Sequence, residues 1–189
     1  MKPAPQPTVD VLVPAAAWSR ALPAAAAMCR KAARAAIAAG APKRLRTKAH
    51  QAEVSILLTT DAAIRKLNAT FRKQDKPTNV LSFPAAQNHP ANRIGDGPPD
   101  LHLGDVVVAY GTVAREAKES HKSLKDHLSH MVVHGVLHLL GYDHESAADA
   151  KTMERLETKI LSQLGIVDPY REPAFEPAPS KKRGARRRT

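Results

Sequence analysis

Residues 134–144 read His-Gly-Val-Leu-His-Leu-Leu-Gly-Tyr-Asp-His, and the rest of the chain is organised around this stretch. His134 and His138 are four residues apart, so on a helix they share one face, with their Cβ atoms about 5–6 Å apart. Gly141 predicts the end of that helix, because glycine readily adopts the left-handed conformation that closes a last turn. The chain reversal can bring His144 to the same ion, and three neutral imidazoles suit zinc.

The residue types in this stretch indicate which kind of zinc site it would form. No cysteine is near, and three histidines leave a fourth position open to water, as in catalytic zinc sites. Peptidases with an H-E-x-x-H motif place a glutamate beside the first ligand as general base. That position here is Gly135, which disfavours peptidase chemistry and leaves room for another backbone or a substrate. The alternative is a buried, largely apolar helix whose histidines are core residues without a metal.

Length and composition indicate one intracellular domain. A chain of 189 residues is long enough for one well-packed core and too short for two domains of ordinary size. The single cysteine, Cys29, excludes an internal disulfide and fits a reducing cytosol. Four basic residues interrupt the alanine-rich stretch 15–39, so it is neither a membrane span nor a signal sequence. We expect a soluble cytoplasmic protein with no membrane partner.

The net charge of +11 and the pI near 10.0 suggest an anionic partner. Six of these charges lie in the C-terminal tail, which leaves +5 for the rest: Lys181, Lys182, Arg183, Arg186, Arg187 and Arg188. The tail follows a proline-rich segment and lacks apolar periodicity, so we expect it to be disordered. It can bind RNA non-specifically through phosphate contacts, or it can be a solubilising end with no specific role.

The order of elements predicts an α+β fold. Strands are expected at 9–13, 53–59, 80–84 and 103–109, and helices at 14–39, 60–71, 112–119, 123–140 and 146–164. Residues 85–100 form an irregular excursion. The prediction is one compact domain at 9–168, between a flexible N-terminus at 1–8 and a disordered tail at 169–189. Its mixed sheet of about four strands is covered by about five helices, with the metal site at the C-terminal end of a buried helix.

Three motifs, which occur along the chain in the same order as in the family, resemble the YbeY family. They are the histidine stretch 134–144, the segment Pro-Thr-Asn-Val-Leu-Ser-Phe-Pro at 77–84 with Arg72 before it, and Leu-Gly-Asp at 103–105. The similarity runs from the second strand to about Gly165. Residues 85–100 and the basic tail lie outside the pattern, and Asn79 takes the amide version of a position that is often aspartate.

The resemblance implies a zinc-dependent endoribonuclease that is specific for single-stranded RNA and matures ribosomal RNA. His134, His138 and His144 would be the zinc ligands, and Arg72 would be the functionally important arginine of the family. We therefore expect these four residues to carry catalysis. The family is implicated in maturing the 3′ end of small-subunit ribosomal RNA and in ribosome quality control. The implied partners are that RNA and the small subunit, with ribosomal proteins or an assembly GTPase, and no DNA.

Several points stay open at the level of sequence. A phosphodiester suits three neutral ligands around a divalent cation, with Arg72 holding phosphate oxygens if it faces the same cleft. The nucleophile can be a zinc-activated water or the 2′-hydroxyl of the RNA. The scarcity of aromatic residues suggests that the ribosomal particle or a protein partner sets the cleavage position. The alternative function is a non-enzymatic ribosome assembly factor with a structural zinc.

Other side chains near these motifs have open roles. His127 and His130 precede His134 on one helical stripe and are fourth ligands, proton carriers or, as we favour, supporting residues. Asp143 either orients a ligand histidine or caps the turn. We expect Asp105 to be a buried hydrogen-bonding residue without a catalytic role, whereas Ser82 contacts substrate or satisfies strand backbone.

Overall fold

The computed structural model describes residues 6–43, 45–46, 49–85 and 102–171. Its strands are β1 (Thr8–Leu12), β2 (Glu53–Thr59), β3 (Val80–Pro84) and β4 (His102–Ala109). Its helices are α1 (Ala16–Ala21), α2 (Ala25–Gly40), α3 (Asp61–Arg72), α4 (Tyr110–Glu119), α5 (Leu124–Leu139) and α6 (Ala147–Gln163), with a short 3₁₀ turn, η1 (Ala49–Gln51). The predicted α+β class is confirmed.

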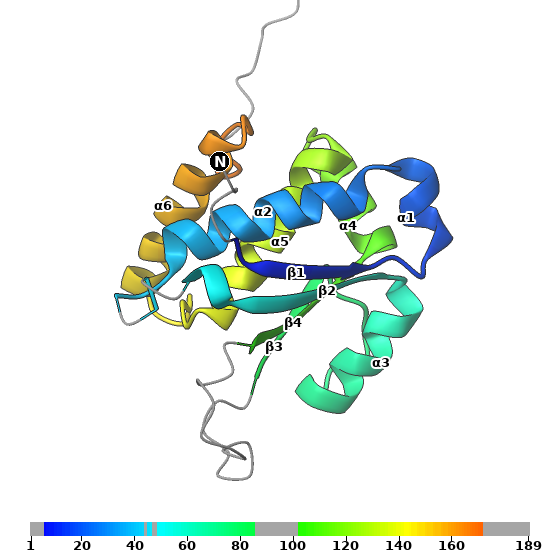
Figure 1. Cartoon of the computed structure of the whole chain (residues 1–189). Coiled ribbons are helices and arrows are strands. Elements are labelled where there is room, and N and C mark those ends of the chain that lie inside the picture. The colour runs from blue at the N-terminus through cyan, green and yellow to red at the C-terminus, as the bar shows by residue number, and fades with distance from the viewer. Residues whose placement is uncertain (1–5, 44, 47–48, 86–101, 172–189) are drawn as a thin grey trace, which may run out of the picture.

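The four strands form one mixed sheet in the order β1-β2-β4-β3. The pairs β1–β2 and β2–β4 are parallel, whereas β3 is antiparallel to β4 and lies at the edge. Successive residues of a strand point to opposite faces. Val106 and Val108 of β4 therefore pack into the large core with α2, α5 and α6, while Val107 and Ala109 pack under α3. Helices thus cover both faces, with α3 alone on its side (Figure 1).

The first predicted helix is divided into two helices in the structure. The alanine-rich stretch was predicted to run unbroken over residues 14–39, but α1 ends at Ala21 and α2 begins at Ala25. The break falls at Pro23, because the proline ring disfavours a helical conformation at the residue before it. Leu22 accordingly has φ −146° and ψ 79°, outside the helical region. The break lets Trp18 of α1 become fully buried, where its Nε1–H donates to the Thr59 carbonyl at 3.2 Å.

Both ends of the described chain contact the rest of the fold. β1 begins at Thr8, within the segment expected to be flexible. At the other end, the Pro169 carbonyl accepts a hydrogen bond from Lys122 Nζ at 2.6 Å, and Tyr170 contacts α6. The excursion expected at 85–100 and most of the predicted tail lie outside the described residues. None of the described helices has the length and apolar character needed to cross a membrane.

Candidate metal centre

The helix α5 places two of the three predicted ligands and is held rigidly by its neighbours. Its N-cap is Ser123, whose Oγ accepts a hydrogen bond from the Asp126 amide at 3.0 Å. Most of the helix is buried, and its apolar side chains pack against α2 and the sheet. Ser82 of the edge strand donates a hydrogen bond from Oγ to the Gly135 carbonyl at 3.0 Å, so β3 lies directly beside the first ligand. The core therefore fixes the position of His134.

The end of α5 directs the third ligand. Gly141 has φ +94°, its amide donates to the His138 carbonyl at 3.0 Å, and the Tyr142 amide donates to the Leu137 carbonyl at 3.1 Å. This is the Schellman arrangement, in which a left-handed residue closes the last turn and satisfies its carbonyls. The sequence prediction of a glycine stop is confirmed. The reversal brings His144, an exposed residue, next to the two partly exposed histidines of the helix.

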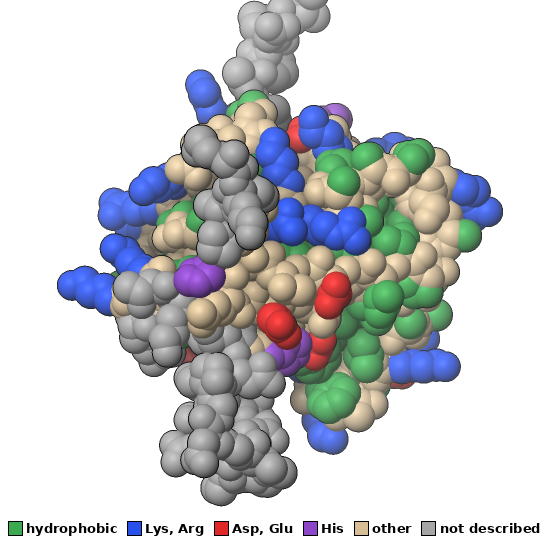
Figure 2. Space-filling view, in the orientation of Figure 1, with side chains coloured by type: hydrophobic (Ala, Val, Ile, Leu, Met, Phe, Trp, Pro, Cys, Tyr) green, Lys and Arg blue, Asp and Glu red, His purple; other side chains and the backbone are tan. Residues whose placement is uncertain are grey.

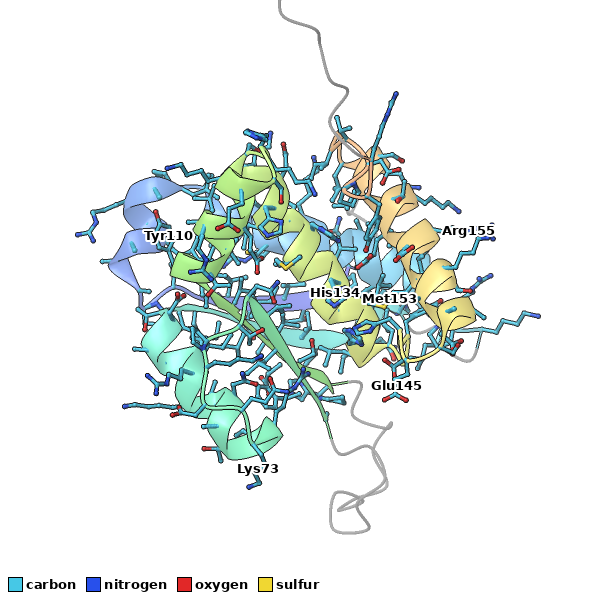
Figure 3. All side chains as sticks on the ribbon, turned by 180° about the vertical axis from the view of Figure 1, so that it is seen from behind. Lys73, Tyr110, His134, Glu145, Met153 and Arg155 are labelled. Carbon is cyan, nitrogen blue, oxygen red and sulfur yellow. The ribbon has the colours of Figure 1, made fainter. Side chains whose placement is uncertain are left out.

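The three histidines converge, as predicted. One ring nitrogen from each of His134, His138 and His144 lies within 4.8 Å of the other two, the only such metal-ligand group among the described residues. The Nε2 atoms of His134 and His138 are 3.1 Å apart. Two nitrogens bound tetrahedrally to zinc at ~2.0–2.1 Å would lie roughly 3.3 Å apart, which is close to this separation. We call these three residues the histidine triad; Figure 3 shows His134 on the exposed side of α5.

The second ring nitrogen of each helical ligand has a partner, which decides the tautomer. His138 Nδ1 is 3.0 Å from the Tyr142 carbonyl oxygen, and only a protonated Nδ1 can form that hydrogen bond. His134 Nδ1 is 2.8 Å from Oε1 of Glu157, a fully buried residue of α6, and donates to it in the same way. Both Nε2 lone pairs are then free to bind an ion. Carboxylate and carbonyl partners of this kind are typical of metal-bound histidines.

The electrostatics favour a neutral His138 and an ionised Glu157. Burial lowers the pKa of His138, and the neighbouring His134 and His144 lower it further. Metals bind the neutral form of imidazole, so this shift helps the triad to bind a cation. Burial alone would raise the pKa of Glu157, but its polar contacts with His130, His134 and Tyr170 outweigh that effect and lower the pKa to about 2. Glu157 is therefore a carboxylate at neutral pH.

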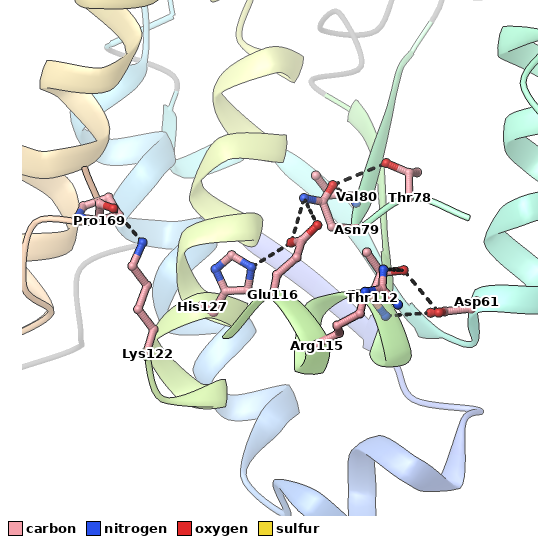
Figure 4. Close-up of polar contacts among 10 residues, drawn as sticks. All are labelled: Asp61, Thr78, Asn79, Val80, Thr112, Arg115, Glu116, Lys122, His127 and Pro169. Carbon is pink, nitrogen blue, oxygen red and sulfur yellow. Dashed lines mark hydrogen bonds and ion pairs between the residues drawn. The ribbon is translucent and has the colours of Figure 1, made fainter. Parts of the chain in front are cut away.

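The other two histidines of the stripe, His127 and His130, are not part of the triad. His130 Nε2 lies 3.7 Å from Oε2 of Glu157, so it contacts the residue that holds His134. His127 Nε2 donates to Glu116 of α4 at 2.9 Å. The same carboxylate accepts from Nδ2 of Asn79 at 3.0 Å, which links α5, α4 and the start of β3 (Figure 4). Burial lowers the pKa of His127 in spite of Glu116, whose charge opposes the shift.

The remaining candidates are distributed around the sheet. Asp143 accepts a hydrogen bond from the His144 amide at 2.7 Å, so it caps the turn. Asp105 is exposed, contrary to the expectation of a buried residue, because it points to the opposite face of the sheet from Val106, which packs into the large core. Arg72 is the exposed last residue of α3, the helix on the opposite face of the sheet from α5. No contact among the described residues joins Arg72 to the triad, and its role stays a prediction.

Sequence reasoning missed Glu157 and Tyr170. Glu157 lies on the apolar stripe of α6 that contains Met153 and Ile160, and all three are nearly or fully buried. A carboxylate among core positions needs a partner, because an unpaired buried charge is costly. That conflict was visible in the sequence and could have indicated Glu157. Tyr170 donates from its hydroxyl to Oε2 of Glu157, but no local pattern signals this contact.

Comparison with known proteins agrees with the motifs. A family model described as Endoribonuclease YbeY matches residues 22–165. The chain belongs to the endoribonuclease YbeY family. Endoribonuclease YbeY of Bradyrhizobium sp. (strain BTAi1) is 48% identical over 170 residues, which cover 90% of this chain and 96% of that one. The protein of the same name from Rhizobium etli is 58% identical over 118 residues, which cover 62% of this chain and 66% of that one.

The YbeY family is thus the one that the sequence motifs predicted. A solution structure of the Thermotoga maritima protein TM1509 aligns with 93% of this chain and 100% of its own, at 22% identity and a TM-score of 0.47. The YbeY family model spans α2 through the end of α6, and so includes all three histidines of the triad, Glu157 and Arg72.

Proposed function

We propose that this YbeY-family chain is a zinc-dependent endoribonuclease that cuts single-stranded RNA. The observation that carries the proposal is the convergence of three histidine nitrogens, two of which have their second ring nitrogen already bonded. The names of the relatives, Endoribonuclease YbeY, support RNA as the substrate. We propose further that it acts in the cytoplasm on the 3′ end of small-subunit ribosomal RNA and in ribosome quality control. Its partners there would be the small subunit and its proteins or an assembly GTPase.

In such a reaction, different residues of the chain would bind the metal, orient its ligands and bind the RNA. His134, His138 and His144 would hold the zinc ion through one ring nitrogen each. When bound, zinc would supply Lewis-acid polarisation of a phosphoryl oxygen and make a water molecule more acidic. Glu157 and the Tyr142 carbonyl hold the imidazoles of His134 and His138 in the tautomer that presents Nε2. The exposed guanidinium of Arg72 would bind a phosphate of the RNA with two parallel hydrogen bonds.

Metal content is the first test, because every other step depends on it. The protein, purified without a histidine tag, should contain about one zinc ion per chain by mass spectrometry, and His138→Ala should lose it. The wild-type protein should then cut single-stranded RNA and leave duplex RNA intact. Absence of metal from the wild-type protein would contradict the catalytic role of the triad.

Arg72→Ala separates an enzyme from an assembly factor. Arg72 is exposed and outside the core, so the variant should keep its melting temperature and its zinc. Loss of RNA cleavage with both properties unchanged would support the enzyme. Lys66→Ala, an exposed cation of the same helix, is the matched control. A wild-type protein that holds zinc and binds the small subunit without cutting RNA would favour the assembly factor.

A substrate without one 2′-hydroxyl distinguishes the two possible nucleophiles. An RNA with a single 2′-deoxy sugar at the cleavage position lacks the hydroxyl that would attack the adjacent phosphate. Cleavage of this substrate at the normal rate would show attack by water, and complete resistance would show attack by the 2′-hydroxyl. The same assay with His138→Ala gives the background.

A further inference from the structure

The positive charge of the folded domain is concentrated in one segment. Residues 11–52 contain no aspartate or glutamate and eight lysines or arginines, so they carry +8 of the net +11: Arg20, Arg30, Lys31, Arg34, Lys43, Arg44, Arg46 and Lys48. The basic tail carries another +6, so the remaining residues together are at −3. The basicity of the domain is therefore a local property of this segment and not an even surface charge.

Three of these cations form a row on the outer face of α2. Arg34 is four residues after Arg30 and three after Lys31, so each of these two cations is its neighbour on the helix surface. Figure 2 shows Lys and Arg side chains in a row over α2. Like charges at this spacing repel each other and destabilise an isolated helix. The row therefore destabilises α2 locally by charge repulsion, and an anionic ligand would reduce this repulsion.

The row borders a groove of about 690 Å³, which we call the α2 groove. Alanines of α2 line it between the cations, and the N-terminal approach to β1 and the η1 turn complete it through Pro7, Ala49 and His50. Small side chains leave the groove open, and none of the described residues that line it is a carboxylate. Arg34 Nε donates to the Pro7 carbonyl at 3.3 Å, but Arg30 and Lys31 form no hydrogen bond or ion pair with other described residues.

The α2 groove and the histidine triad lie on different sides of the molecule. α2 packs against α5 and lies in front of it in Figure 1. In Figure 3, which shows the molecule from behind, α5 and His134 are in front and α2 lies behind them. A ligand in the groove therefore cannot touch the reacting atoms, and its effect would be on affinity and placement.

We propose that the α2 groove binds the phosphate backbone of the substrate RNA at a distance from the cleaved bond. This inference rests on the proposed function, which makes RNA the anionic macromolecule that the chain meets. Arg30 and Lys31 have no hydrogen-bond or ion-pair partner among the described residues, and no described carboxylate lines the groove beside them. Such a site suits phosphates, whose binding by Lys and Arg is largely electrostatic. Among the described residues, His50 is the one aromatic side chain that lines the groove, so the contacts there are mainly with phosphates and largely independent of base sequence.

The test compares two variants that each lose two positive charges. Arg30→Gln/Lys31→Gln removes the free cations of the groove and keeps Arg34, which supports Pro7. Lys66→Gln/Lys118→Gln removes exposed cations of α3 and α4 and is the control. Binding of a fluorescent single-stranded RNA of about 20 nucleotides is measured by anisotropy over a series of salt concentrations, with the full chain in each case.

The groove variant should bind the RNA roughly tenfold more weakly at low salt and show a salt slope smaller by about 1.4, from about 0.7 per lost phosphate contact. The control should keep the wild-type slope, and the tail contributes equally to both. Circular dichroism verifies that both variants are folded. A groove variant that behaves like the control would overturn the proposal.

A second measurement separates this proposal from the proposed function. An RNA of about 5 nucleotides has few phosphates beyond the cleaved bond that could reach the groove, so the groove variant should lose much less activity on it than on the longer RNA. If the wild-type protein cuts no RNA but the groove variant still loses affinity and slope, the groove binds RNA and only the enzymatic function fails. If the variant loses binding to phosphatidylserine vesicles while RNA binding is unchanged, the groove is a membrane contact and the proposal is wrong.

Discussion

At the scale of single residues, the geometry of the triad depends on the hydrogen bonds that Nδ1 of His134 and Nδ1 of His138 donate. His134 and His138 point Nε2 into the triad only while Nδ1 donates to a fixed acceptor. His138 uses the Tyr142 carbonyl, which the glycine stop places one turn away. His134 uses Glu157, which comes from another helix. The geometry of the triad therefore depends on the packing of α6 against α5 as well as on the histidine motif.

Glu157→Gln tests this dependence. Glutamine keeps an acceptor for His134 but removes the charge, so we expect zinc affinity to fall about 10–100-fold, as for other partners of metal-bound histidines. Competition with a chromogenic chelator measures the affinity, and thermal denaturation of the metal-free protein measures stability. If Glu157 only fills space in the core, stability will change and zinc affinity will not.

Tyr170→Phe removes a single donor to the same carboxylate. The ring can keep its contact with His130, whose centroid lies 5.6 Å away, while Glu157 loses the hydroxyl. Hydrogen bonds to charged groups contribute about 1.5–3 kcal/mol, so the free energy of unfolding should fall by about that amount. Tyr142→Phe is the control, because its hydroxyl has no hydrogen bond among the described residues. Equal unfolding midpoints in denaturant for the two variants would contradict this role.

The convergence of the histidine triad was predictable from sequence because its spacing is local. Helical periodicity and a glycine stop place His134, His138 and His144 together without knowledge of the rest of the fold. Glu157 and Tyr170 are 23 and 36 positions beyond His134, and their contacts depend on how α6 and the chain after it pack. Arg72 came from the family resemblance, and the fold places it on another face. Sequence alone could not supply these long-range relations.

At the scale of elements, the close approach of α5 to the sheet explains Gly135. A Cβ at this position would lie 2.6 Å from Cγ1 of Val106 and 3.1 Å from Oγ of Ser82. The sequence left open whether the glycine admits a backbone or a substrate. In the structure, the space beside Gly135 is filled by the side chains of Ser82 of β3 and Val106 of β4. Because Gly135 has no side chain, α5 can pack closely against β3 and β4.

Gly135→Ala should therefore destabilise the protein in spite of the better helix propensity of alanine. Overpacking a core costs about 1–3 kcal/mol, against a gain of about 1 kcal/mol from replacing glycine in a helix. Thermal denaturation should show a lower melting temperature. Val106→Ala makes room, so Gly135→Ala should cost less in that background than in the wild-type protein. Equal costs in both backgrounds would rule out the contact with Val106 as the cause.

The junction of α4, β3 and α5 explains the amide at residue 79. Asn79 Nδ2 donates to both oxygens of Glu116, at 3.3 and 3.0 Å, and its Oδ1 accepts from the Val80 amide at 2.7 Å. An aspartate would keep the second contact and place a negative charge against Glu116. The amide is therefore a requirement of this chain's own network.

Asn79→Asp should lower the free energy of unfolding by about 1–3 kcal/mol, because a hydrogen bond is replaced by repulsion between carboxylates. Denaturant titration gives the loss, and Glu116→Gln provides the matching background. In that background the aspartate can accept from the glutamine amide, so the loss should largely disappear. An undiminished loss would show that Glu116 is not the partner that matters.

The predicted elements were mostly right because turn and cap residues mark their ends. Thr60, Ser123 and Ser146 all cap helices through their side chains. The error at the first helix arose because its alanines have high helix propensity, whereas Pro23 acts on the conformation of Leu22. The pairing order of the strands was not predicted, since it depends on contacts between segments far apart in the chain.

At the scale of the whole molecule, the core does not need the metal. The apolar side chains that join α2, α5, α6 and the sheet are nearly all buried, whereas the triad lies at the surface with His144 exposed. Burial of those side chains is the dominant stabilising term in a domain of this size. The metal-free protein should therefore be folded, and zinc should add to a stability that already exists.

Zinc should raise the melting temperature by an amount that depends on its concentration. Free zinc at about 100 times its dissociation constant would stabilise the folded state by about 2.7 kcal/mol. At roughly 2–4 °C per kcal/mol for a chain of this length, the shift is about 5–10 °C. Excess chelator should reverse it, and His138→Ala should show no shift. Complete unfolding of the wild-type protein by chelator at room temperature would instead make zinc part of the fold, as in the assembly-factor alternative.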